Sequence, residues 1–208
     1  MRNVLIVGPS FGIESIYSAY GYNPIFSNRS DAKDQRIDLV SFMGGVDINP
    51  KLYGEAPVSE TQTPNNHRDT FEIAMYHKYK TVPKVGICRG AQLLNVLNGG
   101  KLYQHVNNHN GADHEVIDIY GNTIRVSSVH HQMMIPSANS QLIAWAKPRA
   151  TFRKNQHGID QPSDKDPEIL FIPEDKALLF QGHPEFGPDQ CTRYFFHLID
   201  TLIWKDAA

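Results

Sequence analysis

The sequence is poor in cysteine, in net charge and in long apolar runs. Its 208 residues include only two cysteines, Cys88 and Cys191, so no disulfide framework is expected and a reducing cytoplasm is predicted. The formal net charge of -2 lacks the basic excess that binds nucleic acid or an anionic membrane, so neither is expected as a partner. The apolar run that follows Met1 is too short to span a membrane and lacks the form of a signal peptide.

What is present is the composition of a folded domain. Hydrophobic residues make up 40% of the chain and charged residues 20%, which argues against disorder. This length is enough for one sizeable core, and the sequence shows no linker, repeat or low-complexity segment. We therefore expect residues 1–208 to form a single domain.

Short buried strands alternate with helices in the first half of the sequence. Apolar runs at residues 3–8, 38–45 and 83–87 are typical of strands buried on both faces of a parallel sheet. Residues 68–79 and 89–100 have the apolar spacing of helices, and the second of these ends at a pair of glycines. This alternation predicts an α/β fold whose parallel sheet is covered by helices on both faces.

The second half of the sequence is typical of antiparallel structure. Residues 115–129 contain two short strands around a Tyr120-Gly121-Asn122 turn, which predicts a hairpin. The other expected elements are short strands within 141–155, a surface loop at 157–168, a hairpin formed by 168–173 and 177–185, and a closing helix at 188–204 that carries Cys191 as a small apolar residue.

Cys88 lies between Gly86 and Gly90, at the junction of a predicted strand and a predicted helix. This spacing has the form of a nucleophile elbow, a tight turn that exposes its central side chain above the carboxyl end of a strand. The helix that begins at Arg89 directs the positive end of its dipole at the sulfur, which favours the thiolate. The alternative is an inert cysteine buried at the end of a strand.

A nucleophilic thiol needs a base, and the base needs a group that orients it. His183 and Glu185 follow another apolar run, and in extended chain residues two apart point the same way. His183 could then face Cys88 while Glu185 holds the imidazole. The alternative is that both are solvated residues of a loop.

Four blocks of sequence together resemble the class I glutamine amidotransferase superfamily, in particular its gamma-glutamyl hydrolase branch, peptidase family C26, which includes the gamma-glutamyl-gamma-aminobutyrate hydrolases. The blocks read FMGGVDINPKLYGE, GICRGAQLLNVLNGGKLYQHV, VSSVHHQM and FQGHPEF. The resemblance extends from about Val4 to Phe196. The first block separates this branch from the amidotransferases, which usually have Gly-Pro-Gly there.

The resemblance implies a flavodoxin-like, mostly parallel sheet with helices on both faces and a small antiparallel extension. It also implies a catalytic triad of Cys88, His183 and Glu185, and no cofactor. The remaining implied site residues are Gly45 and Arg89, whose backbone N–H groups would form an oxyanion hole, and Gln92, His131 and Gln132, which would contact the glutamyl part of the substrate.

Two polar segments, residues 107–115 and 149–157, depart from the family pattern. They would contact the part of the substrate beyond the glutamyl group, so the resemblance does not identify the leaving group. The second segment carries Arg149, Arg153 and Lys154, and these basic residues favour a leaving group that bears a carboxylate.

Several polar residues invite a second interpretation. His105, His109 and His114 raise the hypothesis of a zinc site, but their irregular spacing and the lack of a cysteine or acid cluster favour a solvated loop, so no metal is expected. His130 is interpreted as a packed or solvent-facing residue. Arg68, Asp69 and Glu72 could flank the site, but we interpret them as a charge pair at the end of a helix.

Three functions remain open. The leading hypothesis is hydrolysis of a gamma-glutamyl amide, either glutamine or a gamma-glutamyl amine, through a gamma-glutamyl thioester on Cys88. The first alternative is a glutaminase subunit that passes ammonia to a separate synthetase or ligase chain. The third is a catalytically inert homologue with a binding or regulatory role.

Overall fold

A nine-stranded sheet organises the part of the chain that the computed structural model describes, residues 1–28, 35–62, 64–111, 113–160 and 164–205. In spatial order its strands are β2 (Tyr22–Phe26), β1 (Arg2–Val7), β3 (Leu39–Phe42), β4 (Lys84–Ile87), β14 (Ala177–Phe180), β13 (Asp166–Ile172), β10 (Gln141–Ala146), β7 (His114–Asp118) and β8 (Thr123–Val126).

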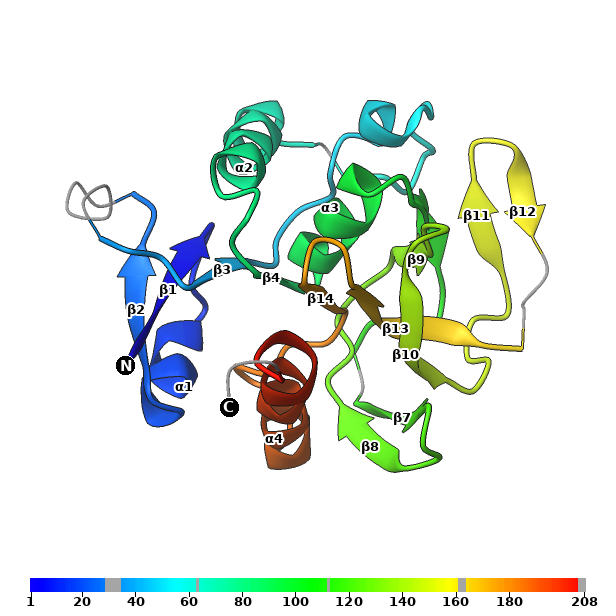
Figure 1. The fold of residues 1–208 in the computed structure, drawn as a ribbon. Helices are drawn as coiled ribbons and strands as arrows, with labels where there is room; N and C mark the ends of the chain where they lie inside the picture. The colour runs from blue at the N-terminus through cyan, green and yellow to red at the C-terminus, as the bar shows by residue number, and fades with distance from the viewer. Residues whose placement is uncertain (29–34, 63, 112, 161–163, 206–208) are drawn as a thin grey trace.

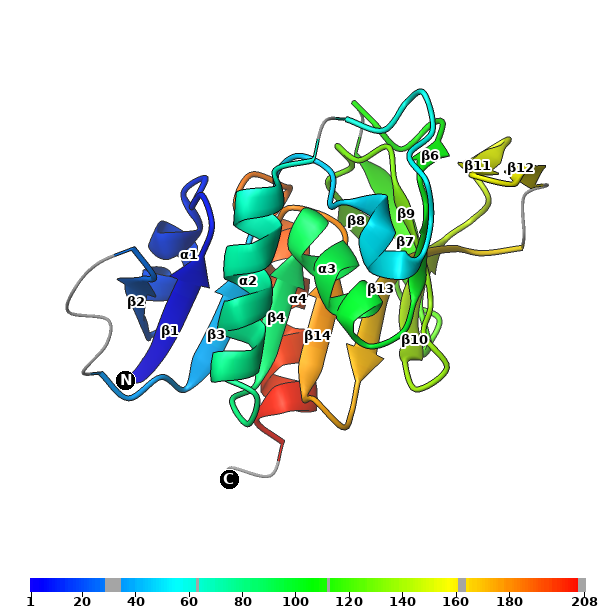
Figure 2. The same cartoon turned by 90° about the horizontal axis from the view of Figure 1, so that it is seen from above.

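The strands from β2 to β14 are parallel and form the α/β half of the molecule. Helices α2 (Asn66–Lys78) and α3 (Arg89–Leu97) cover one face of the sheet, and α1 (Ile13–Ala19) and α4 (Asp189–Leu198) cover the other (Figures 1 and 2). Every residue of β3, β4 and β14 is buried, because these strands have helices on both sides. The predicted fold class is confirmed.

The strands from β13 to β8 are antiparallel. Two small sheets lie beside them: β5 (Lys101–Tyr103) pairs with β9 (Met133–Ile135), and β11 (Arg153–Asn155) pairs with both β6 (His105–Val106) and β12 (Gly158–Asp160). The β11–β12 hairpin projects from the end of the molecule opposite β2 (Figure 1).

The predicted hairpin around Tyr120–Asn122 is confirmed by the β7–β8 pair, and the hairpin in residues 168–185 by the β13–β14 pair. The surface loop expected at 157–168 is wrong in part. Gly158–Asp160 is a strand, and β13 already begins at Asp166, because neighbouring backbone supplies hydrogen-bonding partners that the polar sequence does not reveal. Residues 161–163 of this prediction lie outside the described residues.

Two elements carry weak sequence signals. Strand β2 contains Pro24, which lacks a backbone N–H and is tolerated because β2 is an edge strand that pairs only with β1. Helix α1 has seven residues, and it is preceded by the N-cap residue Gly12, whose φ of 91° lies in the left-handed region that glycine enters without strain.

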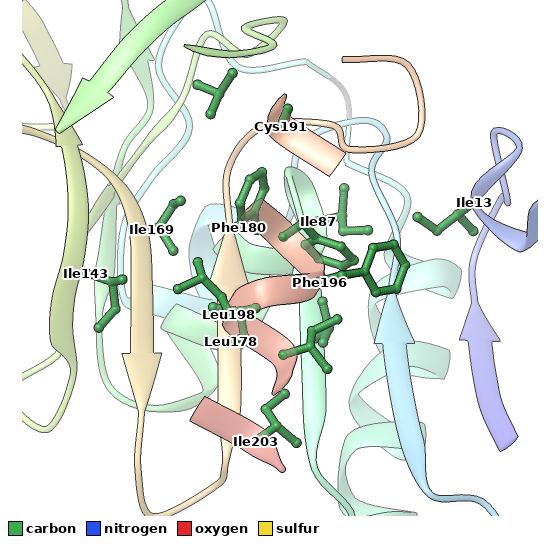
Figure 3. Close-up of a cluster of buried hydrophobic side chains, with 14 of the residues drawn as sticks. Ile13, Ile87, Ile143, Ile169, Leu178, Phe180, Cys191, Phe196, Leu198 and Ile203 are labelled. Carbon is green, nitrogen blue, oxygen red and sulfur yellow. The ribbon is translucent and has the colours of Figure 1, made fainter. Parts of the chain in front are cut away.

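The closing helix is confirmed, although α4 ends at Leu198 and continues as a π-helical turn at Ile199–Ile203. Figure 3 shows Cys191 near Phe180 in the core between α4 and the sheet. Cys191 is fully buried, and burial raises the pKa of its thiol to about 12. It is therefore the small apolar residue that the sequence predicts, with little thiolate at neutral pH. None of the helices in the described residues is long and apolar enough to cross a membrane.

Candidate active site

The corner that carries Cys88 is a strained strand-to-helix turn. Strand β4 ends at Ile87, Cys88 has φ 51° and ψ -111°, and α3 begins at the next residue. The flanking glycines are needed for close approach. A Cβ at Gly86 would lie 2.5 Å from the backbone nitrogen of Ala91, and one at Gly90 would lie 2.1 Å from the carbonyl oxygen of Phe42. A backbone held in such a conformation is typical of a nucleophile elbow.

His183 lies between Cys88 and Glu185. Its Nδ1 is 2.6 Å from the Glu185 Oε1, and the Glu185 side chain is fully buried. The Cε1–Nε2 edge of the ring faces Gly44, where a Cβ would lie 2.7 Å from the His183 Cε1, 3.3 Å from its Nε2 and 3.7 Å from the Cβ of Cys88. Thiol, imidazole and carboxylate therefore lie in the order that a catalytic triad requires.

This setting favours the imidazolium form of His183. Burial alone lowers the pKa of this ring, but its hydrogen bonds to Cys88 and Glu185, together with their charges, raise the pKa to about 10. At neutral pH the proton therefore resides on His183, and it can be donated to a leaving group.

Neighbouring groups fix the position of His183. The backbone N–H of His183 donates to the Ser127 hydroxyl at 2.6 Å, and that hydroxyl donates to the His183 carbonyl oxygen at 3.1 Å. Phe186 stacks on the ring with centroids 4.4 Å apart, and Phe11 approaches it edge-on at 6.5 Å. Ser127 directly follows β8, so the antiparallel half also positions His183.

A cavity of about 90 Å³ opens beside Cys88. The predicted residues Gly45, Gln92, His131 and Gln132 all line it. Its complete lining is Gly45, Asp47, Gln62, Cys88, Gln92, Asn110, Val129, His130, His131 and Gln132. Larger cavities of about 360 and 710 Å³ lie elsewhere, against the β7–β8 hairpin, and neither contains Cys88 or His183.

Asp47, Gln62 and Asn110 were not predicted from the sequence. Asp47 accepts from the His131 Nε2 at 3.0 Å and from the backbone N–H of Gln62 at 2.8 Å, so it orients one wall of the cavity. Its place in the GGVD block, two residues after Gly45, was the signal that could have identified it.

The turn at Gly44 and Gly45 is held by Arg68. The Arg68 guanidinium donates to the carbonyl oxygens of Met43 and Gly44, each at 2.8 Å, and pairs with Glu72 at 2.7 Å. Gly45 has φ 143°, and a Cβ there would lie 2.0 Å from the Arg68 Nη1. A larger residue here would be strained by the positive φ and would have to displace the guanidinium.

The side chain of Arg89 points away from the cavity. It is buried and forms ion pairs with Asp69 and Glu72 on α2. The interpretation of Arg68, Asp69 and Glu72 as a local charge pair at a helix end is therefore too narrow. Together with Arg89 they form a network that ties the turn after β3 to the turn after β4, where the two backbone N–H groups predicted for the oxyanion hole lie.

For the polar segments, the expected solvated histidine loop is wrong, and the argument from a basic loop to the leaving group loses support. Arg153 is buried and ion-paired with Asp166, and Lys154 pairs with Glu60, so these cations are already compensated and do not form an open basic loop. His109 and His114 are buried and not solvated, because strands of the antiparallel half enclose them. His105 is the half-buried member of the predicted group, and its Nδ1 lies 3.3 Å from the Nδ1 of His131. His130 is packed, as expected.

Comparison with known sequences identifies the family of the chain. Residues 24–149, more than half of the chain, match the Peptidase C26 family. A glutamine amidotransferase-like protein of Lactococcus lactis subsp. cremoris is 46% identical over 70 residues, which are 33% of this chain and 37% of that protein. A protein of Mycobacterium tuberculosis named as a glutamine amidotransferase is 31% identical over 179 residues, 76% of this chain and 53% of that one. The carbamoyl phosphate synthase small chain of Acinetobacter baylyi is 29% identical over 123 residues, 58% of this chain and 30% of that one.

The chain spans about half or less of these curated relatives. Among solved structures, a Thermotoga maritima protein named as a glutamine amidotransferase has a TM-score of 0.59 at 14% identity. The match covers 100% of this chain and 86% of that one, which establishes a shared fold. The segment that matches the family includes Cys88 and stops before His183. By sequence and fold together, the chain belongs to peptidase family C26 of the class I glutamine amidotransferase-like superfamily.

Proposed function

We propose that this chain hydrolyses a gamma-glutamyl amide, glutamine or a gamma-glutamyl amine, through a gamma-glutamyl thioester on Cys88. The observation that carries the proposal is the arrangement of His183, whose Nδ1 contacts Glu185 and whose ring also forms a hydrogen bond with Cys88. Membership of the family supports hydrolase or amidotransferase chemistry of this general kind.

The reaction follows from where the protons lie. The Cys88 thiolate attacks the side-chain carbonyl carbon, and backbone N–H groups of Gly45 and Arg89 stabilise the resulting oxyanion. The carbon–nitrogen bond breaks as the His183 imidazolium donates its proton to the leaving amine. Neutral His183 then takes a proton from water, the water oxygen attacks the thioester, and glutamate leaves as the thiolate is restored. Glu185 holds the ring throughout.

The size and chemistry of the cavity support a small glutamyl group. At about 90 Å³ the cavity is well below the roughly 300–1,000 Å³ of sites for drug-sized ligands. Gln92, His131 and Gln132 offer amide and imidazole groups, and Asp47 offers a carboxylate for the α-ammonium group of the substrate. The leaving amine then extends towards the open side of the cavity.

The direct test is to trap the intermediate. The purified protein is incubated with glutamine or a gamma-glutamyl amine, quenched in acid and examined by peptide mass spectrometry. A glutamyl group on the Cys88 peptide, absent in Cys88→Ala and retained in Cys191→Ala, is the expected result. A chain that releases no glutamate from any of these substrates, and forms no adduct, would be the inert homologue instead.

The names of the relatives favour a second candidate, a glutaminase subunit that delivers ammonia to a separate synthetase or ligase. Glutamine would then be the preferred substrate, and its hydrolysis would accelerate when the partner is added. Ammonia release from glutamine and amine release from gamma-glutamyl amines, each measured with and without candidate partner chains, separates the two functions.

A further inference from the structure

Three histidines converge on one glutamate in the antiparallel half of the molecule. His109 precedes β7, His114 is its first residue, His130 follows β8, and Glu168 lies on β13. All four are buried, with exposed fractions between 0% and 4%. They come from three separate regions of the chain, and only the folding of the antiparallel strands brings them together.

The nitrogens that face Glu168 lack ordinary partners. Three imidazole nitrogens surround the Glu168 Oε1: the His109 Nδ1 and the His114 Nε2 at 3.1 Å each, and the His130 Nε2 at 3.5 Å. Within the described residues, none of these three nitrogens and neither Glu168 oxygen makes a hydrogen bond of acceptable geometry. Buried polar atoms without hydrogen bonds destabilise a protein. A cation bound between the three nitrogens and the Glu168 carboxylate would compensate them.

The far nitrogens of two rings are held in place. The His109 Nε2 lies 2.9 Å from the Asp166 Oδ2, and the His130 Nδ1 lies 2.9 Å from the carbonyl oxygen of Gln132. Carboxylate and carbonyl groups in this outer position fix the tautomer and the direction of histidines that bind metals. Here they direct the opposite nitrogens of His109 and His130 towards Glu168.

We propose that His109, His130 and Glu168 bind a divalent transition-metal ion, with Zn²⁺ the best match, and that His114 is the fourth ligand. One ligand atom from each of the first three residues lies within 4.8 Å of the others. Nitrogen and oxygen ligands at about 2.0–2.2 Å from a tetrahedral zinc are separated by roughly 3.3 Å from one another. The separations of 3.1–3.5 Å around the Glu168 Oε1 agree with this value.

The site is structural and supports the substrate cavity. His130 also lines the cavity beside Cys88, and Gln132, whose carbonyl oxygen holds the His130 ring, lines it too. A metal would therefore fix this wall of the cavity to β13. His114 also lines the separate cavity of about 360 Å³ against the β7–β8 hairpin.

A proton is the competing source of positive charge. Burial lowers the pKa of His109, but its contacts with Asp166 and Glu168 outweigh burial and raise the pKa to about 9. An imidazolium at this position would compensate Glu168 without a metal. A chain that binds the metal contains one ion per chain and a chain that binds the proton contains none, and this metal content can be measured directly.

The experiment is metal analysis of the purified full chain by plasma mass spectrometry after dialysis. Chelator-treated protein is then titrated with Zn²⁺ and with Co²⁺. We expect one ion per chain, visible absorption bands typical of tetrahedral Co²⁺, and a higher melting temperature with metal. His109→Ala and Glu168→Gln should each weaken binding by more than about 100-fold, and loss of the outer partner in Asp166→Asn by about 10–100-fold.

His157→Ala and His197→Ala are matched controls, because both rings are exposed and distant from the cluster in sequence, and both variants should bind metal as the wild type does. Should the ligand variants fail to fold, the Zn²⁺ and Co²⁺ measurements on the wild type decide the matter alone. A wild-type chain that retains no metal and gives no tetrahedral Co²⁺ spectrum would overturn the proposal and leave the proton as the occupant. Metal binding that is unchanged in a folded His109→Ala variant would overturn it as well.

Discussion

Buried histidines occur in two different settings in this molecule. In the α/β half, His183 has one partner on each side, a carboxylate and a thiol, and its backbone is fixed by Ser127. In the antiparallel half, His109, His114 and His130 surround a single oxygen of Glu168 without satisfactory hydrogen bonds to it. The first arrangement holds one mobile proton, and the second offers several lone pairs to one cation. The partners of a histidine, more than its burial, therefore decide what it can do.

Two adjacent serines connect the two settings. Ser127 exchanges hydrogen bonds with the backbone of His183, whereas the Ser128 hydroxyl donates to the His109 carbonyl oxygen at 2.6 Å. Both serines are buried. The segment after β8 thus forms part of each cluster, and neighbouring substitutions can disturb one while leaving the other.

The largest effect is expected for Cys88→Ala, which removes the nucleophile. Turnover should fall by on the order of 10³–10⁶-fold while the circular dichroism spectrum and melting temperature stay close to those of the wild type. Cys191→Ala is the matched control, since its thiol is buried between α4 and the sheet and stays protonated. Near-normal turnover of Cys88→Ala would show that the strained corner has no catalytic role.

Glu185→Gln should lower kcat by about 10²–10⁴-fold, because the amide no longer stabilises the imidazolium but still fills the same space. The same change at Glu168 should act on metal content and melting temperature, with a smaller loss of kcat. Steady-state kinetics and metal analysis of both variants provide the comparison. Equal losses of kcat in the two variants would mean that the clusters do not act separately.

Ser127→Ala should lower kcat by about 10–100-fold. The substitution leaves the buried N–H of His183 without an acceptor, at a cost of about 1–3 kcal/mol, and no longer holds the His183 backbone in place. Ser128→Ala removes one hydroxyl of the same type one residue away, and it should mainly weaken metal binding. If Ser128→Ala had the larger effect on kcat, the assignment of the two serines to the two clusters would be reversed.

The smallest effect is a change in the alkaline limb of the pH–rate profile. With the pKa of His183 raised to about 10 by Cys88 and Glu185, kcat should be maintained at neutral pH and fall as pH rises through that value. The raised pKa also stabilises the fold: the contribution is complete below about pH 6.5, the unfolded value, and is lost as pH approaches 10. In Glu185→Gln the alkaline limb should move to lower pH. A limb that stays in place would contradict the role of Glu185 in raising the pKa.

The sequence was most informative where the signal is local. The glycines around Cys88 have a spacing that permits few turns, and His183 and Glu185 are two residues apart in one extended segment, so the structure brings the three predicted groups together. Local pattern also predicted the buried strands and the α2, α3 and α4 helices. Strand β2 and helix α1 were not predicted. Pro24 disfavours a strand at β2, and the seven residues of α1 are too few to give a clear helical pattern.

What only the tertiary structure decided are the contacts between distant segments. Arg153 is a loop cation by sequence, yet Asp166 pairs with it in the interior. His109 and His130 give no metal-binding spacing, yet the antiparallel strands bring both to Glu168. A linear pattern records residues that are neighbours along one strand or helix. The order in which strands pair determines the partners of a buried charge. That order depends on the packing of the whole sheet and cannot be inferred from the residues of any single segment.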